Sequence, residues 1–177
     1  MSEANAGAKP PLSPEDAKKA AAVTEAIAAT FGRMMALLTT SPRHRALPLE
    51  AASALVMPPM MLGQFAVVGA RNQKDGPMAI AAAAWWAFVS PDVDQRLSSS
   101  RDAVLRLEAA DWKSGSIPWI VDVAGDQKIV NELLKQVSTR NFQGAPVKLR
   151  AFTDKGQIVV GKIEPPKDQP GEPGVKT

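Results

Sequence analysis

The chain has 177 residues, of which 45% are hydrophobic and 22% are charged, a balance typical of one globular domain and not of a disordered chain. A formal net charge of +3 is too small an excess to indicate nucleic-acid binding. Because the chain has no cysteine and one histidine, a disulfide framework, a thiolate nucleophile and a Cys- or His-rich metal centre are excluded.

The sequence carries no pattern typical of export or membrane insertion. Residues 1–12 lack the apolar core of a secretory signal. The longest apolar run, residues 79–89, is about half of the roughly 20 residues that a membrane-spanning helix needs. We therefore expect a cytoplasmic protein with no membrane span. Residues 1–12 and the Pro- and Gly-rich residues 165–177 are predicted to be disordered tails around one domain, residues 13–164.

The first predicted element is a helix that begins at Ser13. The Ser13 hydroxyl can cap the helix, Pro14 suits the first turn, and the two acidic residues that follow favour the positive end of the helix dipole. Apolar residues at spacings of three and four continue the helix to about Thr40. Prolines then interrupt the chain, so residues 43–61 are predicted to be a structured connection with one short helix at residues 49–55.

The rest of the chain alternates between strand and helix patterns. Residues 64–70 and 79–89 are apolar runs on either side of a turn-forming segment, which predicts an antiparallel hairpin. Residues 92–108 predict one broken helix or two short helices, residues 117–123 a strand and residues 126–137 a helix.

A second hairpin completes the predicted elements. Its strands are expected at residues 147–153 and 157–163, around turn-forming residues 154–156. The order of elements predicts an α+β single domain, in which helices flank a mixed and largely antiparallel sheet.

The first cluster of residues that could take part in a reaction is Ser41-Pro42-Arg43-His44-Arg45, just beyond the predicted end of the first helix. Common nucleotide-binding, zinc-protease and hydrolase motifs are absent from the sequence. A loop position lets these polar side chains meet a substrate, and His44 is the candidate for acid–base chemistry. The alternative is that His44 is an ordinary surface or capping histidine.

A second candidate is Asp122, near the carboxyl end of the strand predicted at residues 117–123. A carboxylate on a strand is held rigidly and suits the orientation of a catalytic group. The alternative is that Asp122 only caps the helix predicted to follow. The four tryptophans are interpreted as core residues before any role in binding.

Several short motifs follow one another in a characteristic order. They are Ser41-Pro42-Arg43-His44-Arg45 with Pro48, then Gln64, then Trp86-Ala87 with Ser90, then Asp111-Trp112-Lys113-Ser114-Gly115 and Trp119-Ile120-Val121-Asp122. In this order, over about residues 32–122, they resemble the RTX toxin-activating lysine acyltransferases. The resemblance implies transfer of a fatty acyl group from acyl carrier protein to internal lysines of an RTX protoxin in the cytoplasm. It also implies a GNAT-like fold.

The resemblance implies roles for individual residues. The essential histidine of the family falls on His44 and its essential aspartate on Asp122. His44, as a neutral imidazole, would remove a proton from the target lysine while Asp122 orients the ring, and an acyl-His44 intermediate is the other route. Ser41 falls on the family's serine position near the histidine. Substrate-binding positions are expected at Ser41, Arg45, Gln64 and Trp86, and no metal is expected.

The resemblance also implies the partners of the chain. No bound cofactor is expected, and the resemblance implies acyl-loaded carrier protein as the acyl donor. The absence of a glycine-rich loop for the pyrophosphate of coenzyme A agrees with this donor. A basic face for the acidic carrier protein, or merely a solvated surface, is expected from Arg43, Arg45, Lys128, Lys135, Arg140, Lys148 and Arg150. A homodimer is compatible with the composition. A non-catalytic adaptor that binds carrier protein or an RTX-type partner, and an enzyme that uses acyl coenzyme A, are the alternatives.

Overall fold

The computed structural model describes residues 13–71, 76, 78–100, 106–142, 145–152 and 158–164. The tails predicted at residues 1–12 and 165–177 lie outside these residues. So do the turn predicted at residues 154–156 and part of the helical region predicted at residues 92–108.

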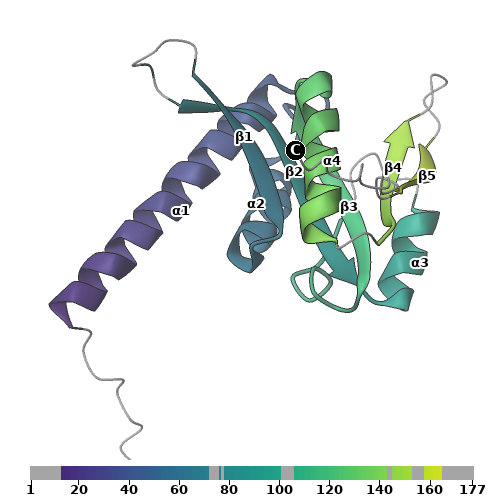
Figure 1. Cartoon of the computed structure of the whole chain (residues 1–177), viewed down its shortest axis with the longest axis horizontal. Helices are drawn as coiled ribbons and strands as arrows, with labels where there is room; N and C mark the ends of the chain where they lie inside the picture. Colours follow the sequence, from purple (N-terminus) through teal and green to yellow (C-terminus); the bar gives the residue numbers. More distant parts are fainter. Residues whose placement is uncertain are drawn as a thin grey trace, which may run out of the picture.

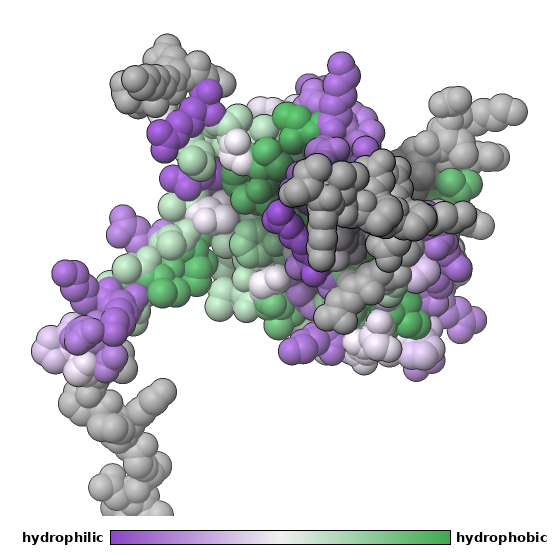
Figure 2. All heavy atoms as spheres, viewed as in Figure 1, coloured by the Kyte–Doolittle hydropathy of each residue, from purple (hydrophilic) through white to green (hydrophobic). Residues whose placement is uncertain are grey.

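The first helix begins where the sequence predicts. α1 spans Pro14–Thr40, and the Ser13 hydroxyl accepts a hydrogen bond from the backbone N–H of Asp16 at 3.1 Å. The N-terminal part of α1 extends away from the body of the molecule and carries mostly hydrophilic residues at its tip (Figures 1 and 2). The buried residues of α1 are near its C-terminal end, at Met34, Leu37 and Leu38. Packing therefore fixes the end of α1 that leads into the predicted cluster.

By length and composition, α1 alone among the described helices could cross a membrane. Core helices of other proteins pass the same test, and the C-terminal end of α1 is packed against the core. The helix also carries charged residues along its length, including Lys19 and Arg33. The composition of α1 is therefore weak evidence for a membrane span.

The second helix is longer than the sequence predicts. α2 spans Leu49–Leu62 and runs through Pro58 and Pro59, so the helix predicted at residues 49–55 is confirmed but its predicted end is wrong. A proline removes one backbone N–H and crowds the carbonyl four residues earlier. Both prolines lie near the C-terminal end of α2, where few further hydrogen bonds depend on them. Burial of one side of the helix, which includes Val56 and Pro59, offsets the loss.

The helix within the region predicted at residues 92–108 ends at Ser99, and residues 106–108 are not helical, contrary to the prediction. The remaining elements are confirmed in kind, with small differences in their ends. They are β1 (Phe65–Arg71), β2 (Met78–Val89), α3 (Pro91–Ser99), β3 (Ile117–Gly125), α4 (Gln127–Asn141), β4 (Val147–Phe152) and β5 (Ile158–Ile163). The five described strands form one sheet in the order β1-β2-β3-β4-β5. The predicted α+β fold with a mixed, largely antiparallel sheet is thus confirmed.

One pairing in the sheet is parallel and short. β3 runs antiparallel to β2 but parallel to β4, which it meets at Trp119↔Lys148 and Ile120↔Leu149. Within the described residues, the C-terminal half of β3 therefore has no strand partner on the β4 side. This leaves the strand edge beyond Ile120 available for other contacts.

Helices cover both faces of the sheet. α1 and α2 pack on one face and α4 packs on the other, in front of β2 and β3 in the view of Figure 1. Adjacent tryptophans on β2 divide between the two layers, since Trp85 lies in the core cluster under α1 and α2 and Trp86 in the cluster under α4. This follows from the alternation of side chains along a strand.

A half-buried ion pair attaches α3 to the parallel part of the sheet. Asp94 in the first turn of α3 accepts hydrogen bonds from Trp119 Nε1 at 2.7 Å and from Lys148 Nζ at 2.7 Å. Burial by itself would raise the pKa of Asp94, but the hydrogen bonds from Lys148 and Trp119 hold it below its ordinary value. The contact joins one residue from each of α3, β3 and β4.

The end of β3 depends on a glycine. Gly125 has a φ of 116°, and a Cβ at this position would collide with the carbonyl oxygen of Ala81. We expect Gly125→Ala to destabilise the fold by about 2–5 kcal/mol, because left-handed strain and overpacking add. Gly32→Ala is the control, since Gly32 lies within α1 with nothing near the added methyl, and it should stabilise by about 0.5–1 kcal/mol. Urea unfolding of both variants measures the effects, and equal stabilities would contradict this account.

Candidate active site

A tight turn after α1 brings two predicted residues together. The backbone carbonyl of Ser41 accepts hydrogen bonds from the N–H groups of His44 and Arg45, at 3.0 and 2.9 Å. Within this turn the hydroxyl of Ser41 lies 2.7 Å from Nδ1 of the His44 ring. The sequence spacing of three residues therefore places the hydroxyl and the imidazole in direct contact.

An irregularity in the sheet brings the third predicted residue to the same place. The register between β2 and β3 shifts, so that Trp85 faces Asp122 while Trp86 faces Ile120, and Val121 is an extra residue on β3. A bulge of this kind changes the direction of the side chains that follow it. Asp122 thereby lies on the same face of the sheet as Trp85, under the turn that carries His44.

His44 and Asp122 form a buried pair. Nε2 of His44 lies 3.1 Å from Oδ2 of Asp122, and the two residues are 3% and 6% exposed. We assign the ring proton to Nε2, because a carboxylate that is paired with a cation accepts hydrogen bonds and does not donate them. Nδ1 is then the basic nitrogen and accepts a hydrogen bond from the Ser41 hydroxyl.

Arg43 is a member of the site that the sequence analysis did not identify as one. Its guanidinium forms an ion pair with Oδ1 of Asp122 and donates a hydrogen bond to the Val123 carbonyl at 3.0 Å. Its Nη2 lies 3.3 Å from Nε2 of His44. Arg43 thus occupies the edge of β3 that β4 leaves unpaired. Its position between Ser41 and His44 was the available sequence signal, but nothing in the sequence shows which way its side chain turns.

The surroundings favour the neutral form of the His44 ring. Burial and, to a smaller extent, the positive charge of Arg43 together lower the pKa of His44 from an ordinary 6.5 to about 4. The Arg43 ion pair also offsets the charge of Asp122, which would otherwise favour a protonated ring. At neutral pH the imidazole is therefore uncharged and can accept a proton.

A cavity of about 380 Å³ lies beside Ser41. It is lined by Leu37, Thr40, Ser41, Pro42, Ile80, Ala81, Gly125 and Asp126. Ser41 is half-buried, whereas the His44 ring is almost fully enclosed. A molecule in this cavity would meet Ser41 before it could meet His44. The Asp126 carboxylate, which caps α4, adds a negative charge to the same wall.

Of the other predicted substrate-binding residues, Trp86 lies away from the turn that carries His44. Trp86 packs against Phe142 under α4, with ring centroids 5.9 Å apart, on the sheet face opposite His44. Gln64 is buried between α2 and β1, and its Oε1 has no hydrogen-bond partner among the described residues. Arg45 is exposed next to His44. The structure therefore brings Ser41 to the candidate site but places Trp86 away from it.

The cations predicted to form a basic face fall into two groups, those that pair within the fold and those that are exposed on α4. Arg43 is engaged with Asp122, and Lys148 with Asp94, so both cations have partners within the fold. Lys128, Lys135 and Arg140 lie on the exposed side of α4. These three remain candidates for contact with an acidic partner.

A neutral buried histidine between a hydroxyl and a carboxylate is typical of enzymes that remove a proton from a nucleophile. Comparison with known families assigns the chain to a family of acyltransferases. Residues 23–164 match the family model described as HlyC, RTX toxin acyltransferase family. This match covers most of the 177 residues, so the chain belongs to the RTX toxin acyltransferase family. A search of the curated proteins found no match. The family resemblance predicted from the motifs is confirmed, and the mixed sheet is compatible with a GNAT-like fold.

The protonation of His44 is directly measurable because the chain has one histidine. We expect an NMR titration of its ring to give a pKa of about 4. The unfolded chain would have a pKa near 6.5, so the folded state should lose stability as the pH falls from about 6.5 towards 4. Arg43→Leu should raise the pKa of His44 by roughly 1–3 units, since it removes a positive charge and exposes the ring to an unpaired carboxylate.

Arg45→Leu is the matched control for this titration, because it removes a neighbouring guanidinium that does not contact Asp122 in any described interaction. A titration of the wild-type ring near 6.5, or equal shifts in the Arg43 and Arg45 variants, would contradict the assigned electrostatics.

Proposed function

We propose that the chain transfers a fatty acyl group from acyl carrier protein to lysine ε-amines of an RTX protoxin in the cytoplasm. The observation that carries the proposal is the contact of Ser41 with the basic nitrogen of a neutral His44, held by Asp122. Family membership supports the acyltransferase class and an RTX protoxin as substrate. The carrier-protein donor and the lysine acceptor are the parts that the proposal adds.

The chemistry requires a base because a lysine with a pKa of about 10.4 is almost entirely protonated at neutral pH. The ammonium first gives one proton to solvent, and the neutral amine then loses a second proton as it attacks the thioester carbon. We assign this second proton transfer to Ser41 and His44 together. The amine gives its proton to the Ser41 oxygen while the Ser41 hydroxyl proton moves to Nδ1 of His44.

The remaining steps return the site to its starting state. A carbon–nitrogen bond forms, the carbon–sulfur bond of the thioester breaks, and the thiolate of the carrier leaves. The imidazolium then gives its proton to this thiolate, so that an amide and a free thiol are the products. Asp122 stabilises the transient positive charge on the ring.

Direct transfer is favoured over an acyl-His44 intermediate. The His44 side chain is 1% exposed, and both ring nitrogens already have partners in Ser41 and Asp122. An acyl group on either nitrogen would have to displace one of these partners in a closed space. A proton needs no such space.

An acidic carrier protein fits the exposed charges of α4. Lys128, Lys135 and Arg140 are all exposed, although Glu132 lies 3.6 Å from Lys135 and reduces its net effect. Such surface charges contribute chiefly to the rate of association. They support a carrier-protein donor, and an exchange of donors tests it against acyl coenzyme A.

The proposal is tested by mass spectrometry of an RTX-domain substrate after incubation with acyl-loaded carrier protein. We expect acyl-lysine with wild-type protein and a loss of about 10²–10⁴ in kcat/KM for His44→Ala. Ser41→Ala should lose less, about tenfold, because a water molecule can occupy the position of the hydroxyl and carry the proton. Thr39→Ala is the control, since the exposed Thr39 hydroxyl bonds only back to its own helix at Ala36 in the described structure.

The outcomes separate the alternatives. If carrier protein binds but no acyl-lysine forms with any chain length, the chain is an adaptor and the proposal fails. Transfer from acyl coenzyme A but not from carrier protein would overturn the assigned donor. A stable acyl-enzyme formed with donor alone, together with equal losses for Ser41→Ala and His44→Ala, would overturn direct transfer in favour of an acyl-serine.

A further inference from the structure

A second cavity lies along α2, outside the proton-transfer site. It has a volume of about 350 Å³ and is lined by Leu47, Pro48, Glu50, Ala51, Ala54, Leu55, Arg106, Leu107 and Trp112. A volume above about 300 Å³ is within the usual range for small-molecule sites. We call this cavity the α2 groove.

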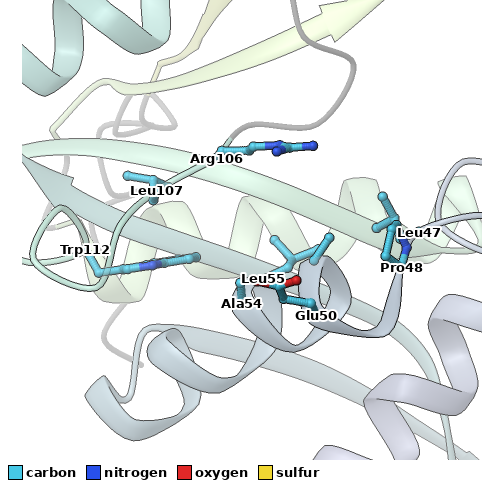
Figure 3. A pocket seen from close by; sticks show the side chains of 9 residues that line it. Leu47, Pro48, Glu50, Ala54, Leu55, Arg106, Leu107 and Trp112 are labelled. Carbon is cyan, nitrogen blue, oxygen red and sulfur yellow. The ribbon is translucent and has the colours of Figure 1, made fainter.

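The α2 groove begins next to the candidate active site. Leu47 lies three residues after His44, and its backbone N–H donates to the His44 carbonyl at 2.8 Å. Figure 3 shows Leu47 and Pro48 at one end of the groove and Trp112 at the other, with α2 along one side. We call the turn at residues 41–45, which carries His44, the catalytic turn. An occupant of the groove can therefore have one end beside this turn and extend away from it along α2.

The walls of the groove are mainly apolar. α2 contributes two alanines, Ala51 and Ala54, whose small side chains leave space, and Leu107 lies on the opposite wall. The charged residues Glu50 and Arg106 carry opposite charges, so together they do not select an ion of one sign. This lining suits an extended hydrocarbon chain better than a charged peptide or a phosphate.

Trp112 forms the end of the groove farthest from Leu47. It is 1% exposed, and its Nε1 finds no acceptor among the described residues. The position is fixed by the adjacent backbone, since the Trp112 carbonyl accepts a hydrogen bond from Phe88 N at 3.1 Å. A buried and fixed indole gives the groove a rigid end and hence a defined length.

We propose that the α2 groove holds the fatty acyl chain of the donor, and that Ala54 and Trp112 determine which chain lengths are transferred. This inference rests on the proposed function, because only an acyltransferase has such a chain to place. With the thioester beside the catalytic turn, the chain runs along Ala51 and Ala54 towards Trp112. Burial of each further methylene strengthens binding roughly fourfold, so a chain that fills the groove is preferred over a shorter one.

The test narrows the groove without disturbing the core. Ala54 is exposed on α2, so Ala54→Phe places a large ring in the groove while the fold is retained. Met61→Phe is the matched control, because Met61 lies on the same helix, is 63% exposed and does not line the groove. Carrier protein is loaded with acyl chains of 8, 12, 14 and 16 carbons, and kcat/KM is measured for each.

We expect Ala54→Phe to lower kcat/KM for the two longest chains by at least tenfold and to leave the shortest within about twofold of wild type. Met61→Phe should keep the wild-type profile. Equal losses at every chain length in Ala54→Phe, with circular dichroism unchanged, would overturn the assignment of the groove.

A binding measurement separates this inference from the proposed function. Hexadecanoyl-pantetheine, a probe with no carrier protein and no acceptor, is titrated while tryptophan fluorescence is followed. Trp112→Phe keeps an aromatic end to the groove and removes the indole, so it should abolish most of the fluorescence change and retain binding by calorimetry. If wild-type protein transfers no acyl group but binds the probe, and Ala54→Phe abolishes binding, the groove is supported and the proposed function fails. Binding that is unchanged in Ala54→Phe would contradict the groove whatever the activity.

Discussion

The candidate site depends on one buried carboxylate, that of Asp122, which contacts a cation and an imidazole at the same time. Arg43 pairs with one oxygen and His44 with the other. If Asp122 met His44 alone, its charge would favour a protonated ring that could not act as a base. Because burial and the charge of Arg43 both lower the pKa of His44, Asp122 can orient the ring while the ring stays neutral. Arg43 and His44, both from the turn after α1, therefore have separate tasks. Arg43 pairs with the charge of Asp122, and His44 accepts the proton.

The bulge in β3 is what allows this arrangement. The extra residue Val121 places Asp122 on the face covered by α1 and α2, where the turn after α1 lies. A regular strand would direct that side chain towards α4. The short parallel pairing of β3 with β4 contributes as well, since it leaves the edge beyond Ile120 open to Arg43. Two local irregularities of the sheet, the bulge at Val121 and the short pairing of β3 with β4, therefore create the site.

Local patterns predicted much of the fold, and the motif order predicted Ser41, His44 and Asp122. The cap at Ser13 and the apolar periodicity are properties of neighbouring residues, so they can be recognised without tertiary contacts. The end of α2 was predicted too early, at residue 55, because Pro58 usually interrupts a helix. In the structure, core packing outweighs this effect of proline. Arg43 was not identified as a site residue, since its contacts join positions about 80 residues apart.

The central claim is that His44 is a neutral base whose free nitrogen, Nδ1, faces Ser41. The most direct measurement is nitrogen-15 NMR of this one histidine in the full chain at pH 7, which reports the protonation of each ring nitrogen separately. The account predicts a proton on Nε2 and none on Nδ1, and a partial loss of this preference in Asp122→Ala. A charged ring, or a proton on Nδ1 with Nε2 free, would contradict it.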